Sequence, residues 1–397
     1  MNAMILPTDS ASHRGAARIV DIINLSSSAD TLLKNRVWLL RQSGVDNRVI
    51  CIDGPYVRRL REVGIPVYTV PLPRGYNPIK LLLSLFRIAS YLSRERIDLV
   101  HTHCSIPGFV GRVAAWLAGV PVIIHTVHGF HFHDRSPRWK RIFYVGIERF
   151  TGLVTHALLS QNQHDLEQAA RYKIVPRDRL RYIGNGIKLD RFPGARPASS
   201  ARGPLTITCV ARFEPVKNHR MLFESARRLK ERGHDFRIWL VGGGDLRSDY
   251  EGLCAKLGIG DRVQFLGYRE DIPELLAQTD ISVLTSVKEG IPRAILESMA
   301  MGIPVVATRV NGSREVVREG ETGFMVELND SVALSDVLER LITDPDLRTE
   351  IGQRAREVAH REYDETSIVE SLKNIYRVQL AQRGVPIRAT APQTAER

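Results

Sequence analysis

The sequence has 397 residues, which is long for a single hydrophobic core, so we expect two domains. Apolar residues make up 43% and charged residues 25%, as in ordinary globular proteins, and no apolar stretch reaches the ~20 residues of a transmembrane helix. The first 200 residues carry 28 Lys and Arg against 14 Asp and Glu, whereas the rest carry 28 against 30, so the positive net charge belongs to the first half.

A basic half attracts anions such as acidic lipid headgroups, pyrophosphate-linked substrates or nucleic acid, although a solvated basic surface also explains it. The first residues lack the apolar core of a secretory signal. The four cysteines lie far apart without C-x-x-C spacing, which argues for a reducing cytosol and against disulfides or a zinc site. They are Cys51, Cys104, Cys209 and Cys254.

Strand-like and helix-like segments alternate along the first half of the chain. The expected strands cover residues 17–25, 47–53, 65–72, 97–103, 121–129, 155–161 and 180–187. The expected helices cover residues 29–44, 78–94 and 108–119. The second of these helices is amphipathic, with basic side chains among its leucines.

The second half repeats this plan. Its expected strands cover residues 204–213, 236–244, 262–267, 281–286 and 304–308, and its expected helices cover 219–233, 250–258 and 294–301. Such alternation predicts an α/β protein with two doubly wound, mostly parallel sheets, which bind ligands at the carboxyl ends of their strands.

The domain limits follow from local composition. Residues 192–204 are rich in Pro, Gly, Ala and Ser, as in a linker, so we predict an N-terminal domain over 1–195 and a C-terminal domain over 204–364. Residues 365–380 read as a terminal amphipathic helix. Residues 381–397 have little apolar content and are expected to be a disordered tail.

Two carboxylates flank a strand-to-helix junction in the segment 282–326. Glu289 follows the strand in the turn EGIP, and Glu297 lies inside the helix, in the apolar run AILESMAM. The turn and the helix N-terminus offer N–H groups and a positive dipole end to phosphate, while the carboxylates can accept hydrogen bonds from hydroxyls. The pair therefore suits a site for a nucleotide diphosphate and a sugar, although packing faces of helices also carry stray glutamates.

Two cations precede this segment in a strand-to-helix loop. Arg212 and Lys217 follow the strand PLTITCVA and can clamp a diphosphate, Arg as a fork and Lys as a point charge. A solvated basic loop is the alternative. Glycines at two further strand ends, Gly242–Gly244 and Gly267 beside Tyr268, allow a ligand to approach the backbone, but they equally suit tight turns. Neither matches a G-x-G-x-x-G fingerprint or a P-loop.

Six histidines lie near two strand ends of the first half: His101, His103, His125, His128, His131 and His133. A metal cluster is one interpretation, but around the histidines of 125–133 no cysteine and only one acidic residue, Asp134, lies close in sequence. We favour a substrate contact by His128, since a neutral histidine can donate or accept a hydrogen bond to a sugar or phosphate.

Together these residues resemble a retaining glycosyltransferase of family 4 with the GT-B fold, over nearly the whole chain. The motifs that carry the resemblance are HTH (101–103), HTVHGF (125–130), GNGI (184–187), RFEPVK (212–217), VGGGD (241–245), FLG (265–267) and EGIPRAILESMAMGIPVVAT (289–308). The Glu-x7-Glu spacing is the most specific of them. The segment HTVHGF resembles the corresponding segment of members that build bacterial capsule, exopolysaccharide or O-antigen chains.

The resemblance implies two Rossmann-like domains that face each other across a cleft, with the terminal helix returning to the first. It further implies that Arg212 and Lys217 bind the donor diphosphate. Glu289 would contact the transferred sugar and His128 would stabilise the transition state at the anomeric centre. The implied nucleotide- and sugar-binding residues are Gly243, Gly267, Tyr268, Gly290, Ile291, Pro292, Arg293, Ala294 and Glu297, with Glu297 on the ribose hydroxyls. No metal and no cofactor are implied.

One stretch departs from the family. Many members have a Gly-Gly loop after the first strand, where this chain has Ser26 to Ser28, so the resemblance does not predict a close approach of the backbone to a ligand there.

The resulting hypothesis is a cytosolic enzyme on the inner face of the cell membrane that moves a hexose or N-acetylhexosamine from a nucleotide sugar, UDP-linked, to a lipid-diphosphate-linked saccharide. The basic first half and the helix 78–94 would contact anionic lipid. The alternatives are a sugar-nucleotide 2-epimerase, a phosphorylase, or a non-catalytic basic module. The chain has no nucleic-acid motif and only 7% aromatic residues, which argues against nucleic acid.

Overall fold

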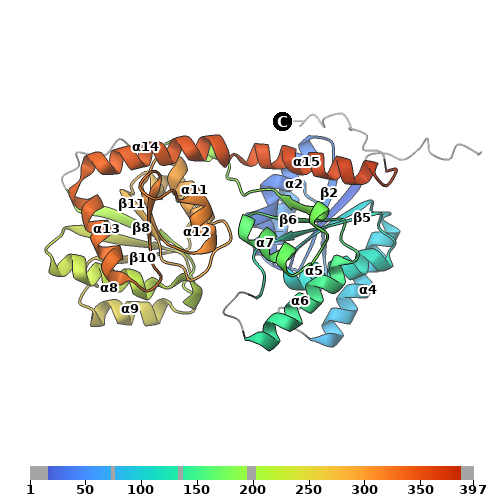
Figure 1. Ribbon diagram of the computed structural model, residues 1–397, viewed down its shortest axis with the longest axis horizontal. Coiled ribbons are helices and arrows are strands. Elements are labelled where there is room, and N and C mark those ends of the chain that lie inside the picture. The colour runs from blue at the N-terminus through green and yellow to red at the C-terminus, as the bar shows by residue number, and fades with distance from the viewer. Residues whose placement is uncertain (1–16, 73–76, 133–136, 195–202, 386–397) are drawn as a thin grey trace, which may run out of the picture. The chain divides into compact units, whose positions relative to one another are not determined.

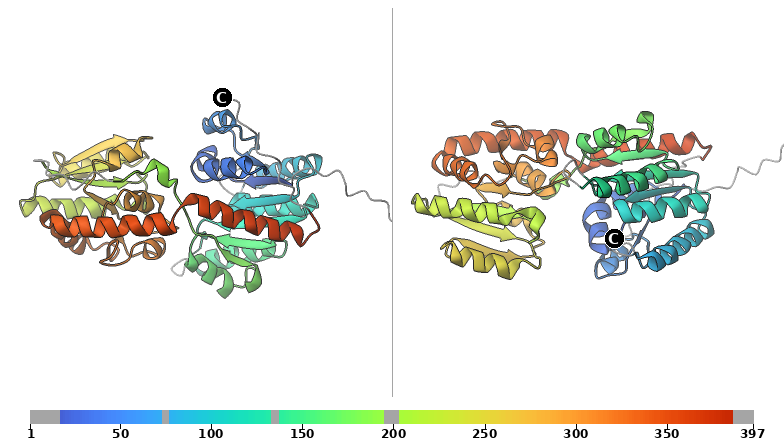
Figure 2. Two further views of the ribbon diagram at one scale, coloured as in Figure 1. Left: turned by 90° about the horizontal axis from the view of Figure 1, so that it is seen from above. Right: turned by 60° about the horizontal axis from the view of Figure 1, so that its bottom comes forward.

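Two parallel sheets organise the chain, each within its own compact unit (Figure 1). The computed structural model describes residues 17–72, 77–132, 137–194 and 203–385. Within these ranges the first unit takes the chain up to Ser160, then Asp165–Ile183 and the part from Val369 onward. The second unit takes Gln161–His164 and Gly184–Ile368. Helices cover both faces of each sheet (Figure 2).

The first sheet has seven strands in the order β3-β2-β1-β4-β5-β6-β7, and every pairing is parallel. The strands are β1 (Arg18–Ile22), β2 (Asp46–Cys51), β3 (Val67–Thr69), β4 (Leu99–His103), β5 (Val122–Val127), β6 (Ala157–Ser160) and β7 (Leu180–Tyr182). The strands β4, β5 and β6 are buried along their whole length, as expected for a parallel sheet covered on both faces.

Three α-helices of the first unit, α3, α6 and α7, were not predicted from sequence, and neither was the short segment η2. The helical segments of this unit are α1 (Ser26–Ser28), η1 (Ala29–Leu33), α2 (Lys34–Gln42), α3 (Tyr56–Glu62), α4 (Pro78–Arg94), α5 (Ser105–Leu117), α6 (Arg138–Gly152), α7 (Gln163–Arg171) and η2 (Arg177–Arg179). Helix α4 has the predicted limits because Asn77 caps it, accepting the N–H of Lys80 at 3.0 Å, and proline opens it. The predicted helix 29–44 begins three residues early, and η1 is a π-helical turn within it.

The second sheet has six parallel strands in the order β10-β9-β8-β11-β12-β13. They are β8 (Leu205–Val210), β9 (Phe236–Val241), β10 (Val263–Gly267), β11 (Ile281–Leu284), β12 (Val305–Thr308) and β13 (Gly323–Val326). The helical segments are η3 (Leu189–Arg191), η4 (Pro215–Lys217), α8 (His219–Glu231), α9 (Arg247–Lys256), α10 (Ile272–Leu276), α11 (Arg293–Ala300), α12 (Asn311–Val316), α13 (Ser331–Thr343) and α14 (Pro345–Glu362). Both domains are therefore doubly wound α/β folds, as predicted.

The last helix, α15 (Glu365–Ala381), returns to the first unit (red in Figure 1). Its residues Val369, Leu372, Tyr376 and Leu380 are buried in one core cluster with side chains of β1, β4, β5 and β6. Val385, which the sequence assigned to a disordered tail, is buried in the same cluster, and its N–H donates to the carbonyl of Leu380 at 3.0 Å. The rest of that tail, 386–397, lies outside the described residues.

The predicted linker 192–204 lies partly outside the described residues as well. Phe192 at its start is 3% exposed and packs in the core of the second unit, so the composition of this stretch was misleading at that position. The predicted domain limits otherwise stay predictions. Across the described residues, no helix combines the length and the apolar character needed to cross a bilayer.

Candidate active site

Each sheet reverses its strand order beside its first strand, between β1 and β4 in the first unit and between β8 and β11 in the second. Doubly wound sheets bind ligands outside the carboxyl ends of their strands at such a switch point. The loop after β8 carries Arg212 and Lys217, and the loop after β11 carries Glu289. Predicted site residues therefore flank the switch point of the second unit.

Lys217 and Glu289 form an ion pair at this place. Lys217 Nζ lies 2.6 Å from Glu289 Oε1, and the two side chains are 18% and 11% exposed. The two loops are joined by hydrogen bonds: Thr285 Oγ1 donates to the carbonyl of Lys217 at 3.1 Å, and the N–H of Val287 donates to the carbonyl of Val216 at 2.8 Å. A cation and a carboxylate are thus held, mostly out of water, where a diphosphate and a sugar hydroxyl could be bound.

The turn that carries Glu289 is supported by two residues to which the sequence analysis gave no role. Asn185 Nδ2 donates to the carbonyl of Ile291 at 3.1 Å, in a buried position. Gly312 of α12 lies so close to the turn that a Cβ atom there would stand 1.3 Å from the carbonyl oxygen of Gly290. Only glycine fits at 312 in this conformation. The signal in the sequence for this glycine was the pair Asn311–Gly312, shortly after the predicted strand 304–308.

Glu297 lies in α11, with its side chain 17% exposed and its Oε1 3.9 Å from Arg293 Nε. Burial raises the pKa of Glu297, and the charges of Arg293 and Arg191 oppose that rise. Helix α11 begins at Arg293, directly after Pro292 and one residue before the start predicted at Ala294. The first turn of this helix offers N–H groups and a positive dipole end beside the turn that carries Glu289.

The glycine triplet after β9 divides into two kinds. Gly242 and Gly244 have φ of 153° and 150°, and a Cβ on them would stand 2.1 Å from the carbonyl oxygen of Ala211 and 2.5 Å from that of Phe213. Close packing therefore requires both glycines. A Cβ on Gly243 would meet nothing within 4 Å. Among the described residues no neighbour requires glycine at this position, and its role in ligand binding stays a prediction.

The remaining predicted residues of this unit lie on neighbouring loops. Arg212 pairs with Glu214 at 2.7 Å, and its side chain is 70% exposed. Gly267 ends β10 with φ of 71° and accepts the N–H of Gly242 at 2.8 Å, which joins the loops after β9 and β10. Tyr268 follows it and is exposed. Arg212 and Tyr268 thus stand at strand ends, as predicted, without entering the Lys217–Glu289 pair.

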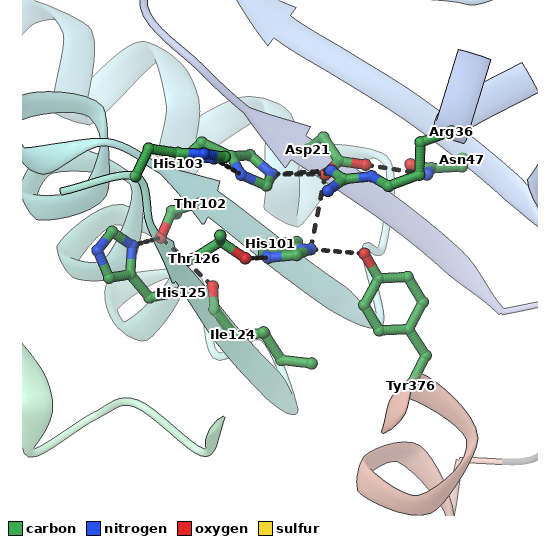
Figure 3. Close-up of polar contacts among 11 residues, drawn as sticks. Asp21, Arg36, Asn47, His101, Thr102, His103, Ile124, His125, Thr126 and Tyr376 are labelled. Atoms are coloured by element: carbon green, nitrogen blue, oxygen red, sulfur yellow. Dashed lines mark hydrogen bonds and ion pairs between the residues drawn. The ribbon is translucent and has the colours of Figure 1, made fainter. Parts of the chain in front are cut away.

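The switch point of the first unit holds a buried polar cluster (Figure 3). Asp21 lies within β1 and is fully buried. Its Oδ1 is 2.6 Å from Arg36 Nη2 and 2.7 Å from His103 Nε2, and its Oδ2 accepts Asn47 Nδ2 at 2.9 Å. His103 Nδ1 lies 3.1 Å from Nε2 of His128, which follows β5. A continuous set of polar contacts therefore joins the buried carboxylate to the predicted substrate-contacting histidine.

Two further histidines of this cluster contact hydroxyl groups of the protein itself. The Nδ1 and Nε2 atoms of His101 lie 2.6 Å from the hydroxyls of Tyr376 and Thr126, respectively. His125 Nδ1 lies 2.9 Å from the hydroxyl of Thr102. Burial lowers the pKa of His101 and of His125 well below the usual range, so both are neutral at pH 7.

Ligand atoms of Asp21, His101 and His103 come within 4.8 Å of one another, which raises the question of a metal ion. The donor set does not suit one. Both ring nitrogens of His101 already face hydroxyls, and the Arg36 guanidinium occupies the carboxylate oxygen that a metal would need. His131 is exposed, whereas His133 and Asp134 lie outside the described residues.

Comparison with known proteins matches the two halves to two related families. Residues 37–186 match the Glycosyl transferase 4-like domain, and residues 195–358 match Glycosyl transferases group 1. The chain is 30% identical over 369 residues to the UDP-Gal:alpha-D-GlcNAc-diphosphoundecaprenol alpha-1,3-galactosyltransferase of Escherichia coli, covering 90% of this chain and 95% of that protein. This chain belongs to glycosyltransferase family 4.

Other relatives of this family 4 glycosyltransferase agree. It is 21% identical over 375 residues to the capsular polysaccharide biosynthesis glycosyltransferase CapM of Staphylococcus aureus, covering 90% of this chain and 96% of CapM. Its fold is similar to that of HepE from Anabaena, solved in complex with UDP and glucose, with a TM-score of 0.79 at 20% identity over 91% of this chain and all of that one. The GT-B fold and the glycosyltransferase class predicted from sequence are thereby confirmed.

Three residues of the polar cluster in this glycosyltransferase were not predicted from sequence: Asp21, Arg36 and Tyr376. A signal existed for Asp21, because an aspartate inside an otherwise apolar, buried strand is costly unless it is paired. The departure at Ser26–Ser28 takes the form of a helix start. Ser26 is buried, and a Cβ on Gly54 would stand 2.5 Å from its Oγ, so this side chain fills space in the fold.

Replacing Glu297 with glutamine is expected to raise the Tm of the glycosyltransferase at pH 7. Because burial raises the pKa of Glu297, its contribution to stability is full below the unfolded pKa and is lost as the pH rises through the folded one. Ionised Glu297 therefore destabilises the fold near neutrality, and the gain in Tm should shrink toward pH 4. Thermal melts across this range test it, with the exposed Glu357→Gln as a matched control. A lower Tm at pH 7 would contradict the reasoning.

Proposed function

We propose that this glycosyltransferase moves a hexose or an N-acetylhexosamine from a UDP-sugar to a polyprenyl-diphosphate-linked saccharide during cell-surface polysaccharide synthesis. The observation that carries the proposal is the Lys217–Glu289 pair at the β8/β11 switch point, in a chain that covers 95% of a relative named for a UDP-Gal donor and a diphosphoundecaprenol-linked GlcNAc acceptor. The charge of Lys217 suits the diphosphate of the donor.

The proposed roles follow the chemistry of the transfer. The bond between the anomeric carbon and the diphosphate breaks, and its electron pair leaves with UDP, which gains a negative charge. The oxygen of an acceptor hydroxyl forms the new glycosidic bond, and its proton passes to the departing diphosphate or to solvent. Lys217 and Arg212 would stabilise that charge, and the first turn of α11 would add its dipole end. Glu289 would hold the transferred sugar, and His128 would act at the anomeric carbon.

The other proposed contacts hold the nucleotide and the sugar. Glu297 would accept the ribose hydroxyls, and the backbone of residues 290–294 would line the sugar and phosphates. Gly243, Gly267 and Tyr268 would contact the nucleotide from the loops after β9 and β10. We expect retention of anomeric configuration, as the family membership implies, and no requirement for a metal ion.

A donor screen tests this function. The enzyme is incubated with UDP-sugars, with and without a polyprenyl-diphosphate-linked N-acetylhexosamine, and UDP release is measured together with the lipid-linked product. We expect release only when donor and acceptor are both present. UDP release without acceptor, together with an epimerised sugar, would favour a 2-epimerase, and the absence of turnover with every UDP-sugar would overturn the proposed donor class.

We further propose that the first unit works on an anionic membrane surface at the inner face of the cell membrane, where a lipid-linked acceptor resides. Helix α5 packs against both α4 and α6, and α4 and α6 lie on one side of this unit (Figure 1). Both carry exposed large apolar side chains: Ile79, Leu82, Leu83 and Phe86 on α4, and Trp139, Ile142, Phe143 and Phe150 on α6.

Basic side chains accompany these apolar ones, namely Lys80, Arg87 and Arg94 on α4 and Arg138, Lys140, Arg141 and Arg149 on α6. Apolar side chains that enter the headgroup region beside cations that meet anionic lipid are the features of an interfacial helix. The sequence analysis identified only α4 as such a contact, and α6 enlarges the surface.

The double replacement Trp139→Ser and Ile142→Ser is expected to weaken binding to vesicles of phosphatidylglycerol and phosphatidylcholine by at least about a hundredfold, because each buried side chain contributes roughly 1.5–3 kcal/mol. Vesicle sedimentation measures it. Trp38→Ser on α2, a partly exposed tryptophan outside these helices, is the matched control and should bind as the wild type does. Unchanged binding by the double variant would exclude α6 from the membrane contact.

A further inference from the structure

The ends of three neighbouring strands bring Asp21, His103 and His128 into one series of hydrogen-bonded groups. Asp21 comes from β1, His103 ends β4, and His128 follows β5. The distances are 2.7 Å from Asp21 Oδ1 to His103 Nε2 and 3.1 Å from His103 Nδ1 to His128 Nε2. Asp21 and His103 are fully buried, whereas His128 is only half-buried. The series therefore leads from the interior toward the surface.

The positions of the protons follow from what each group can donate. A carboxylate only accepts, so the proton between Asp21 and His103 belongs to His103 Nε2. Arg36 Nη2 also donates to Asp21 Oδ1, at 2.6 Å, and its 3.1 Å distance to His103 Nε2 is then a contact between two donors that share one acceptor. His103 Nδ1 is left with a lone pair. It accepts from His128, whose proton must therefore sit on Nε2.

The neighbours of His103 keep it neutral, which this arrangement requires. Burial lowers the pKa of His103 well below the usual range, and the charge of Arg36 lowers it further. A protonated His103 would lose the lone pair that accepts from His128. The other titratable groups at this cluster are His101, whose pKa burial also lowers, and Tyr376, whose pKa burial raises well above the usual range.

Asp21 affects His128 mainly by orienting the hydrogen bonds between them and less by its negative charge. Arg36 places a full positive charge on the same oxygen that His103 uses, so the pair Asp21–Arg36 is close to neutral as seen from His128. The hydrogen bonds, in contrast, are directional and fix which ring nitrogen of His128 is bonded inward.

We propose that Asp21 and His103 are positioning residues that hold His128 as the Nε2–H tautomer and so turn its Nδ1 lone pair toward the substrate. The catalytic side of this inference rests on the proposed role of His128 in sugar transfer. The tautomer itself is a property of the protein without substrate. An unprotonated Nδ1 can accept a hydrogen bond from a sugar hydroxyl, which the opposite tautomer cannot do at that atom.

The first test uses the ring nitrogen chemical shifts of His128 in the full-length protein labelled with 15N-histidine, with His128→Gln to assign the signals. We expect the Nε2–H tautomer in the wild type at pH 7.5. The Nδ1–H tautomer, or an even mixture, would overturn the proposal without any need for a variant of the buried cluster.

Two substitutions of His103 separate its two bonds. The amide of His103→Gln reaches the place of Nε2, so it can donate to Asp21 but not reach His128. The amide of His103→Asn reaches the place of Nδ1 and can still accept from His128. We expect mixed tautomers of His128 in His103→Gln and the wild-type tautomer in His103→Asn. Identical tautomers in both variants would overturn the proposal. Replacement of Asp21 is avoided, since it would leave Arg36 buried and unpaired.

Activity completes the test. We expect kcat to fall about tenfold to a hundredfold in His103→Gln, with KM for donor and acceptor within twofold, and His103→Asn to recover most of kcat. If the tautomers behave as expected but His128→Gln retains full turnover, the proposed role of His128 in transfer fails while the positioning by Asp21 and His103 stands.

Discussion

Replacing Lys217 with alanine should lower kcat/KM for the UDP-sugar by about a hundredfold to a thousandfold, as the loss of one preorganised group opposite developing charge does in other enzymes. The ammonium is held 2.6 Å from Glu289, and the Lys217 side chain is only 18% exposed, so water screens its charge poorly. Its removal also leaves the Glu289 carboxylate without its partner. Both consequences act on the proposed donor site rather than on the core.

Steady-state kinetics with saturating acceptor measure this effect, and Lys256→Ala at the end of α9 provides a matched control of the same residue type away from the site. Arg212→Ala should have a smaller effect, about tenfold, because this side chain is 70% exposed and water screens its charge. If Lys217→Ala keeps kcat/KM within threefold of the wild type, the ion pair does not belong to the donor site.

The arrangement of Lys217 and Glu289 in the second unit was largely predictable from sequence, for a reason of topology. In parallel α/β sheets the polar residues that follow strands gather at one edge, so Lys217 and Glu289 could be placed near each other although 72 positions separate them. What the sequence could not show was that they pair directly, nor that Arg212 pairs with Glu214. Those details depend on the lengths and hydrogen bonds of two loops.

The polar cluster of the first unit was not predictable in the same way. Tyr376 reaches His101 from α15, 275 positions along the chain, and that contact depends on how the last helix packs on the first sheet. Arg36 reaches Asp21 from α2. The sequence showed several histidines at strand ends. Only the fold shows that His101, His103 and His125 are buried and that His128 is half-buried.

Local composition predicted poorly which residues of the linker and of the C-terminal tail are buried, because their burial depends on tertiary packing. Phe192 sits in a stretch rich in Pro, Gly and Ser but is buried, and Val385 follows a polar turn yet completes a core cluster. A single large apolar side chain can fix such a segment, because its burial offsets the freedom that its neighbours lose.

Replacing Gly312 with alanine should lower kcat/KM by at least about a hundredfold, because misplacing a reacting group by roughly 1 Å can have such an effect. A Cβ at this position would stand 1.3 Å from the Gly290 carbonyl oxygen, far inside any contact distance, so either α12 or the turn that carries Glu289 must move. The free energy of unfolding should also fall, by about 1–3 kcal/mol, as in other overpacked sites.

The matched control is Gly252→Ala in α9, where a Cβ would meet nothing within 4 Å. There the same substitution should leave kcat/KM unchanged and raise the free energy of unfolding by about 0.5–1 kcal/mol, because alanine favours a helix over glycine. Denaturant unfolding and donor kinetics measured on both variants separate stability from position. A Gly312→Ala protein that loses stability but keeps its kcat/KM at low temperature would show that α12 takes up the displacement, and Gly312 would then have no role in placing the turn of Glu289.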